Sequence, residues 1–254
     1  MIRSVGIIGY GSFGAFLEVL IKRFAPEATI KIYSSRFNPD LPAQAGGTKF
    51  FSLADTAQCD AVILAVPIRA FEETLTKLLP LMRPDTVIVD VATVKVHTVE
   101  ILKRLAGGRP YIATHPMFGP ESYEKKGGDV SGFRIVMTDG TLPVASYTAL
   151  TAFLKQCGFD VIEMSAQLHD KHLAETLFLT HFVGQTVHRA GFDRTDIDTV
   201  SFGYLMNAVE SVKHDTALFK DVYQFNPFCE EILKRFEAAE GEVHTLLKGD
   251  KIGE

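Results

Sequence analysis

Short runs of β-branched residues alternate with longer segments of helical periodicity from residue 1 to about residue 163. We expect central strands in "SVGII", "ATIKIY", "DAVILAV", "DTVIVDV" and "RPYIAT", and later strands near the edge in "FRIVM" and "FDVIEM". The segments between them place apolar residues three and four positions apart, as in "GAFLEVLIKRF" and "VHTVEILKRLAG", which is typical of helices that cover a sheet. This alternation indicates βαβ units, and it predicts an α/β fold with a doubly wound parallel sheet.

The pattern changes after "FDVIEM". Long helical patterns follow with no strand between them: "AQLHDKHLAETLFLTHFVGQTVHRA", "VSFGYLMNAVESV" and "PFCEEILKRFEAAEGEVHTLL". The sequence therefore predicts an α/β domain over residues 1–164 and an all-helical domain over residues 165–254. No Pro- or Gly-rich linker separates these parts, so the boundary near Ser165 rests on the change of pattern.

Charge and cysteine content disfavour several classes of function. The formal net charge is −5 and the basic residues are scattered, so nucleic-acid binding is not expected. Cys59, Cys157 and Cys229 stand far apart without a CxxC pair, which argues against a disulfide framework and favours a reducing cytoplasm. The chain opens on "IRSVGIIGYG" without the pattern of a secretory signal, and its longest apolar stretch, "DAVILAVPIRAF", is too short to span a membrane.

The motif "GYGSFG" lies where the first strand is expected to end and the first helix to begin. Its glycines fit the GxGxxG pattern of dinucleotide-binding turns, in which the first permits a tight turn, the second admits a pyrophosphate and the third lets helix and strand pack closely. The helix N-terminus would offer N–H groups to the phosphates. The motif makes the first domain Rossmann-like; the alternative is a plain tight turn. The predicted cofactor contacts are Gly9, Tyr10, Gly11, Ser12, Phe13 and Gly14.

The end of the second expected strand carries Ser34, Ser35 and Arg36 and no carboxylate. NAD-selective proteins place an Asp or Glu there, whereas hydroxyls and a guanidinium suit the 2′-phosphate of NADP. We therefore expect NADP rather than NAD; the alternative is that Arg36 is an ordinary solvated residue. Val66 and Pro67 end the strand "DAVILAV" and form either a wall beside the dinucleotide or a simple strand stop.

The stretch "THPMFGPES" places a histidine among prolines that stiffen the chain. His115 follows the strand "YIA" and is therefore expected on a loop at the carboxyl end of the sheet, where open α/β folds bind ligands. Pro116 favours an extended backbone at His115, and Pro120 removes further freedom. A histidine can accept the proton of an alcohol whose carbon releases hydride to nicotinamide. We expect His115 to be this base; the alternative is a structural hydrogen-bonding histidine.

At this point the chain resembles the prephenate and arogenate dehydrogenases of tyrosine biosynthesis. The resemblance rests on "GYGSFG", "SSR", "AVP", "DVATVK", "THPMFGPES", "LTHFVGQ", "FGYLMNAVES" and "YQFNPF", which extend over most of the chain. The pattern is most similar to the plant-like arogenate dehydrogenases, whose members typically prefer NADP. This preference agrees with the separate interpretation of Ser34 to Arg36.

The resemblance implies an oxidative decarboxylation. His115 would bind the 4-hydroxyl of the substrate ring and take its proton while hydride passes to the nicotinamide, and loss of carbon dioxide would restore aromaticity. Thr93, His181 and Gln185 would contact the substrate. Thr93 could instead cap a helix that begins near Lys95, and His181 could be a satisfied core histidine.

The helical part carries further candidates. His169, His172 and Glu175 have spacings that could place metal ligands near one helical face, although we favour a polar face because the expected hydride transfer needs no metal. Its long apolar helices predict a homodimer. Competing functions are a reductase or dehydrogenase of another small acid or imine, similar to the β-hydroxyacid dehydrogenases, and a non-catalytic NADPH-binding regulator. We assign no catalytic role to Glu121 or Ser122.

Overall fold

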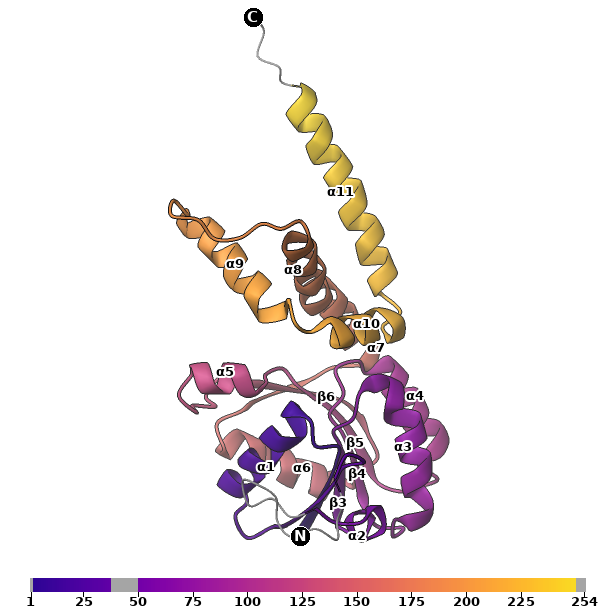
Figure 1. Ribbon diagram of the computed structural model, residues 1–254. Coiled ribbons are helices and arrows are strands. Elements are labelled where there is room, and N and C mark those ends of the chain that lie inside the picture. Colours follow the sequence, from indigo (N-terminus) through magenta and orange to yellow (C-terminus); the bar gives the residue numbers. More distant parts are fainter. Residues whose placement is uncertain (1, 38–49, 250–254) are drawn as a thin grey trace, which may run out of the picture. The chain divides into compact units, whose positions relative to one another are not determined.

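A computed structural model describes residues 2–37 and 50–249 of the chain (Figure 1). The chain divides into two compact units, Met1–His169 and Asp170–Glu254. The domain bounds predicted from the sequence, residues 1–164 and 165–254, stay a prediction.

The first unit contains a seven-stranded sheet in the order β2-β1-β3-β4-β5-β6-β7. Every run expected to form a strand does so, and the α/β, Rossmann-like fold class is confirmed. The β5 and β6 strands run antiparallel, whereas the other paired strands in the described residues are parallel. The strand bounds are β1 Ser4–Ile8, β2 Thr29–Tyr33, β3 Ala61–Leu64, β4 Val87–Asp90, β5 Tyr111–Pro116, β6 Arg134–Gly140 and β7 Asp160–Glu163.

The positions of β2 and β6 differ from the prediction. We expected β2 among the central strands, but it lies at an edge because the chain returns from it to form β3 on the other side of β1. We expected a parallel sheet, but β6 runs against β5 because the connection between them turns back at the end of the sheet where β5 ends.

His115 lies inside a strand, and its expected place on a loop is wrong. The β5 strand continues to Pro116 because β6 pairs alongside it, with His115 opposite Val136 and Pro116 opposite Ile135. The pairing with β6 on one side of β5 therefore fixes the backbone of His115. The residue still lies near the carboxyl end of β5, as predicted.

Helices cover both faces of the sheet (Figure 1). The α1 helix (Ser12–Phe24) and α6 (Val144–Gln156) lie on one face, and α3 (Phe71–Leu78) and α4 (Val96–Leu105) on the other. Two shorter helices are α2 (Leu53–Ala57) and α5 (Pro120–Lys125), and single turns of 3₁₀ helix occupy Ile68–Ala70 and Leu79–Leu81.

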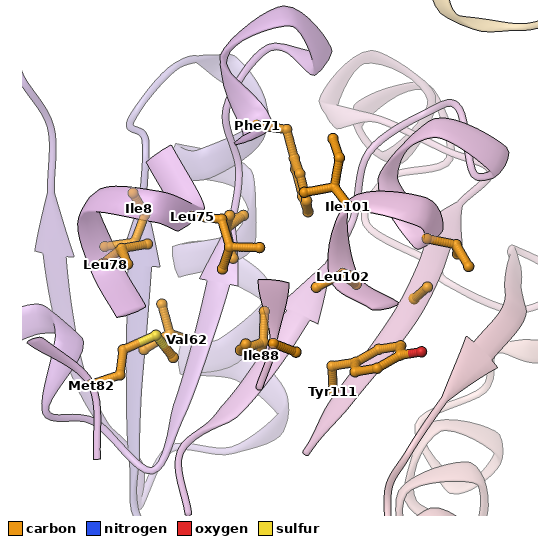
Figure 2. Packing of buried hydrophobic residues seen from close by; sticks show 14 of the residues in the cluster. Ile8, Val62, Phe71, Leu75, Leu78, Met82, Ile88, Ile101, Leu102 and Tyr111 are labelled. Atoms are coloured by element: carbon orange, nitrogen blue, oxygen red, sulfur yellow. The ribbon is translucent and has the colours of Figure 1, made fainter. Parts of the chain in front are cut away.

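A dense apolar core joins α3 and α4 to the sheet, as Figure 2 shows. Phe71, Leu75 and Leu78 on α3 are fully buried because they repeat at three- and four-residue spacing on one face of the helix. Each such side chain contributes about 1.5–3 kcal/mol through the apolar surface that it removes from water. The core lies against β1, β3, β4 and β5. It also contains Ile8, Val62, Met82, Ile88, Ile101, Leu102 and Tyr111.

The regular secondary structure of the second unit within the described residues is helical, as the sequence predicts. The α7 helix (Ala166–Leu173) leads into a π-helical segment at Ala174–Phe178 and then into α8 (Leu179–Arg189). Three further helices follow: α9 (Val200–Val212), α10 (Thr216–Phe225) and α11 (Cys229–Gly249). The α8 and α9 helices pack closely at Gly184, where a Cβ atom would lie 2.4 Å from a methyl group of Val212.

No helix in the described ranges is both long and apolar enough to cross a membrane.

Candidate functional site

The glycine motif forms a tight turn between β1 and α1. Gly9 has φ +99°, and a Cβ atom there would lie 2.4 Å from the carbonyl oxygen of Ala65. At Gly14 a Cβ would lie 2.1 Å from the carbonyl oxygen of Gly9, so only glycine permits this approach of α1 to the strand. Gly11 has no atom within 4 Å of its Cβ position. The turn therefore matches, residue by residue, the roles expected for a pyrophosphate-binding loop.

The N-terminus of α1 suits an anion. Gly11 is its N-cap residue, with no side-chain hydrogen bond at the cap and no acidic residue in the first turn. The N–H groups of that turn and the positive end of the helix dipole are therefore not offset by a carboxylate. Tyr10 is held in place because its hydroxyl donates to the buried Glu18, 2.5 Å away on α1.

A cleft of about 360 Å³ opens beside this turn. The predicted cofactor residues in its lining are Gly9, Tyr10, Gly11, Ser34, Ser35, Arg36, Val66 and Pro67. Ser12, Phe13 and Gly14 lie at the start of α1, outside the lining. The glycine cradle and the cleft together fit a dinucleotide.

Sequence reasoning missed several residues of this cleft. Leu53, Ala70 and Thr74 contribute apolar and hydroxyl surface, and Glu73 pairs with Lys77 at 2.5 Å along α3. The ion pair lowers the pKa of the Glu73 carboxyl and raises that of the Lys77 ammonium. A Glu and a Lys four residues apart on a helix are visible in the sequence, but their place in the cleft follows only from packing of α3 on the sheet.

The turn after β2 presents a cation at the cleft. Ser34 is buried, and its hydroxyl accepts a hydrogen bond from the N–H of Arg36 at 3.4 Å. The N–H of Phe37 donates to the carbonyl oxygen of Ser34, which closes the turn. Ser35 and Arg36 are exposed at its tip. This arrangement leaves the guanidinium at the surface of the cleft, where it can reach an anionic group.

His115 is buried, with 6% of its surface exposed. Its Nδ1 lies 2.9 Å from Nε2 of His169, the last residue of the first unit, and the rings meet edge to face. Burial lowers the pKa of His115 well below its usual range, and the nearby Lys95 ammonium lowers it further. His115 is therefore a neutral imidazole near neutral pH, which is the form that can accept a proton.

A buried ion pair between Lys95 and Asp90 lies next to the strand segment that carries His115. Lys95 is fully buried, and its Nζ donates to Oδ2 of Asp90 and to the carbonyl oxygen of Thr114, both at 2.6 Å. The hydroxyl of Thr98 also donates to Oδ2 of Asp90, at 2.6 Å. The network ties β4 and the start of α4 to the residue that precedes His115.

Thr93 does not cap α4, so that alternative is wrong. The N-cap residue is Lys95, and no side-chain hydrogen bond caps the helix. The chain from Thr93 to Lys95 instead places the lysine inward, toward Asp90. Thr93 is half-buried, and its predicted contact with substrate stays a prediction.

His181 lies on α8 in the second unit and is buried. Its Nδ1 lies 2.9 Å from the carbonyl oxygen of Leu177 and must donate, because a carbonyl only accepts. Nε2 is therefore an acceptor in the neutral ring, and it is buried with no hydrogen-bond partner among the described residues. An orphaned buried acceptor of this kind suits a ligand.

Gln185 is also buried, but its amide is engaged. Its Nε2 donates to the carbonyl oxygens of Val212 and Lys213, at 2.8 and 3.0 Å, and so closes the C-terminal end of α9. The predicted substrate contact of Gln185 stays a prediction, and the geometry gives this residue a structural role.

The proposed polar face on α7 is wrong for His169. This residue is 3% exposed and packs against His115, whereas His172 is largely exposed. A step of three residues turns the side chain by about 60° from its starting direction around the helix, which takes His172 away from the sheet. Within residues 2–37 and 50–249, no group of three metal-binding side chains is close enough to hold an ion.

Ser122 has a local role that the sequence did not suggest. Its hydroxyl accepts from the N–H of Gly119 at 3.0 Å and donates to the carbonyl oxygen of Gly119 at 2.9 Å, at the start of α5. Glu121 is exposed and pairs with Lys125 at 2.7 Å. Both residues stabilise the short helix that follows His115.

A larger cavity, of about 530 Å³, lies beside β6, α6 and the end of β7. None of the predicted site residues lines it. The glycine-turn cleft is therefore the better candidate for the dinucleotide.

Comparisons with known proteins agree with these features. Residues 26–162 match the family model described as "Prephenate dehydrogenase, nucleotide-binding domain", and residues 186–254 match "TYRAAT1-like, C-terminal domain". Arogenate dehydrogenase 1, chloroplastic, of Arabidopsis thaliana is 32% identical over 97% of this chain, which spans 39% of that protein. Cyclohexadienyl dehydrogenase of Zymomonas mobilis is 25% identical over 96% of the chain, which spans 88% of that protein.

Solved structures show the same fold. Prephenate dehydrogenase from A. aeolicus, in complex with hydroxyphenyl propionate and NAD+, has a TM-score of 0.76 at 20% identity, covering 99% of this chain and 93% of its own. Synechocystis arogenate dehydrogenase has a TM-score of 0.66 at 18% identity, and the match covers 98% of this chain and 93% of that protein's chain. The nucleotide-binding family model covers more than half of the sequence. The chain therefore belongs to the prephenate and arogenate dehydrogenase family.

Proposed function

We propose that the protein catalyses the NADP-dependent oxidative decarboxylation of arogenate or prephenate in tyrosine biosynthesis, with His115 as proton acceptor. The observation that carries this proposal is the buried, neutral His115 near the carboxyl end of β5, in the same unit as a glycine cradle. Sequence relatives named as arogenate and cyclohexadienyl dehydrogenases support the substrate class.

Separate groups of residues would bind the cofactor and accept the substrate proton. The glycine turn and the N-terminus of α1 would hold the pyrophosphate, and Ser34, Ser35 and Arg36 would hold the 2′-phosphate. The bound dinucleotide would supply the hydride acceptor. His115 would take the hydroxyl proton of the substrate, which favours release of hydride from the ring carbon.

The substrate would be contacted by His181 and Thr93. The buried Nε2 of His181 supports its role as an acceptor for a substrate group. Thr93, at the end of the segment that follows β4, would add a hydroxyl. Gln185 would act mainly by holding α8 against α9.

A direct assay tests the proposal. Formation of NADPH should be followed with arogenate and prephenate side by side, each at equal protein concentration. Turnover of either substrate, with release of carbon dioxide, supports the proposal. An inactive chain that still binds NADPH tightly would favour a regulator instead.

Arg36→Ala should weaken NADP use selectively. A charge-assisted bond to the 2′-phosphate contributes about 1.5–3 kcal/mol, so we expect the KM for NADP to rise by about 10–150-fold while the KM for NAD changes little. Arg36→Lys is the matched control, because it keeps the charge but cannot bond in bidentate fashion. Equal use of the two cofactors by the parent protein would contradict the NADP preference.

We also propose a homodimer formed through the second unit. Its helices expose apolar side chains, including Val200 and Tyr204 on α9 and Leu246 and Leu247 on α11. Exposed apolar surface of this kind is typical of an interface between subunits. Light scattering coupled to size exclusion measures the mass, and a single-chain mass at assay concentration contradicts the dimer.

A further inference from the structure

The contact between His115 and His169 joins side chains 54 residues apart in the sequence. His115 comes from β5 and His169 from α7, and both are more than nine-tenths buried. The two ring nitrogens that meet are Nδ1 of His115 and Nε2 of His169, at 2.9 Å. This distance is that of a hydrogen bond, and burial protects it from exchange with water.

A hydrogen bond between these nitrogens contains one proton, so it has two possible arrangements. If Nδ1 of His115 donates, Nε2 of His115 carries a lone pair and can accept a proton from another group. If Nε2 of His169 donates instead, the neutral His115 carries its proton on Nε2 and cannot act there as a base. The direction of this one bond therefore decides whether His115 can perform its proposed role.

We propose that His169 is a positioning residue that accepts the Nδ1–H of His115 and thereby holds His115 in the tautomer with an unprotonated Nε2. This inference rests on the proposed function, in which His115 removes a substrate proton. The role requires a neutral His169, because both nitrogens of an imidazolium are donors. When Nε2 of His115 takes up the proton, the same contact becomes a charge-assisted bond that stabilises the imidazolium.

The surroundings of His115 already contain two buried charges, those of Lys95 and Asp90. The ammonium of Lys95, the residue before α4, disfavours a positive charge on His115. The carboxylate of Asp90 on β4 accepts hydrogen bonds from Lys95 and Thr98. A carboxylate in the place of His169 would add a further buried charge. A second imidazole supplies the acceptor and the orientation without one. Catalytic histidines are commonly oriented by a hydrogen bond at the nitrogen that does not react.

Variants of His169 separate this role from a purely structural one. His169→Leu removes the acceptor, and we expect kcat to fall by about 10–100-fold, the range typical of groups that orient an active-site side chain. The KM for substrate and the dissociation constant of NADPH should stay near the parent values, because His169 is 3% exposed and does not line the glycine-turn cleft. His169→Gln can place a carbonyl oxygen near the position of Nε2 and should regain most of the lost kcat. His172→Leu, the same change on the exposed side of α7, should keep the parent kcat.

Nitrogen-15 NMR of the histidine rings reads the tautomer directly in the full chain. We expect Nδ1 of His115 to be protonated and Nε2 unprotonated in the parent and in His169→Gln, with this preference lost in His169→Leu. His115→Asn assigns the signals. A parent His115 protonated on Nε2, or a His169→Leu variant that keeps both the parent tautomer and the parent kcat, would overturn the inference. The parent spectrum needs no variant to fold. If the parent oxidises neither substrate, the proposed function fails, and the tautomer still decides the role of His169.

Discussion

His115→Asn is expected to lower kcat by about 10²–10⁴-fold, the usual contribution of a general base. Asparagine is smaller than histidine and its amide cannot accept a proton near neutral pH, so the chemical step loses its acceptor. The residue lies outside the lining of the glycine-turn cleft, and NADPH binding should therefore change little. His244→Asn, the same change at an exposed residue of α11, is the matched control and should leave turnover intact.

The pH dependence of turnover gives this prediction a second measurement. His115 must be neutral to act, so kcat/KM should fall as the pH drops through its folded-state pKa. Burial, together with the nearby Lys95 ammonium, lowers that pKa well below the usual value of 6.5. We therefore expect kcat/KM to stay level through pH 6.5 and to decline only in more acidic buffer. Near-normal kcat in His115→Asn, or a parent profile that already declines above pH 6.5, would refute the assignment.

The strands were predictable because their signal is local. A run such as "DTVIVDV" combines β-branched residues with polar ends, and this pattern is enough to predict β4. The direction of a strand has no such signal. The run "FRIVM" would look the same in a parallel or an antiparallel pair, and only the connection through α5 makes β6 run against β5. The same pairing extends β5 over His115, which a local pattern could not show.

The candidate site was predictable where its chemistry lies in one segment. The glycine turn carries its conformational requirements in its own sequence, and Gly9 meets them with a positive φ. The partners of His115 and Lys95 come from other strands and helices. His169 was visible only as a histidine in a helical pattern, and nothing in that pattern gives the direction in which it points. Polar contacts across the fold depend on how α7 and β5 pack, which spacing within one segment cannot encode.

Lys95→Met is expected to destabilise the fold by about 3–5 kcal/mol, the usual cost of leaving a buried charge without its partner. Both side chains of the Lys95–Asp90 pair are fully buried, so no water can replace the lost ammonium. The carbonyl oxygen of Thr114, next to His115, also loses its donor. The loss can be measured as the free energy of unfolding in urea, followed by circular dichroism. Lys103→Met is the matched control on the same helix, since Lys103 pairs with Asp139 at an exposed position and should contribute at most about 1 kcal/mol.

A second substitution distinguishes loss of charge balance from loss of packing. Asp90→Asn in the Lys95→Met background removes the uncompensated carboxylate while keeping an oxygen that can accept from the N–H of Ala92. The double variant should therefore be more stable than Lys95→Met alone, because the net worth of a buried ion pair is small compared with the cost of breaking it. If the lysine acts only by filling space, the two changes should add, and the double variant should be the less stable of the two. A loss below about 1 kcal/mol in Lys95→Met, the range of exposed pairs, would show that the buried network does not hold the segment before His115 in place.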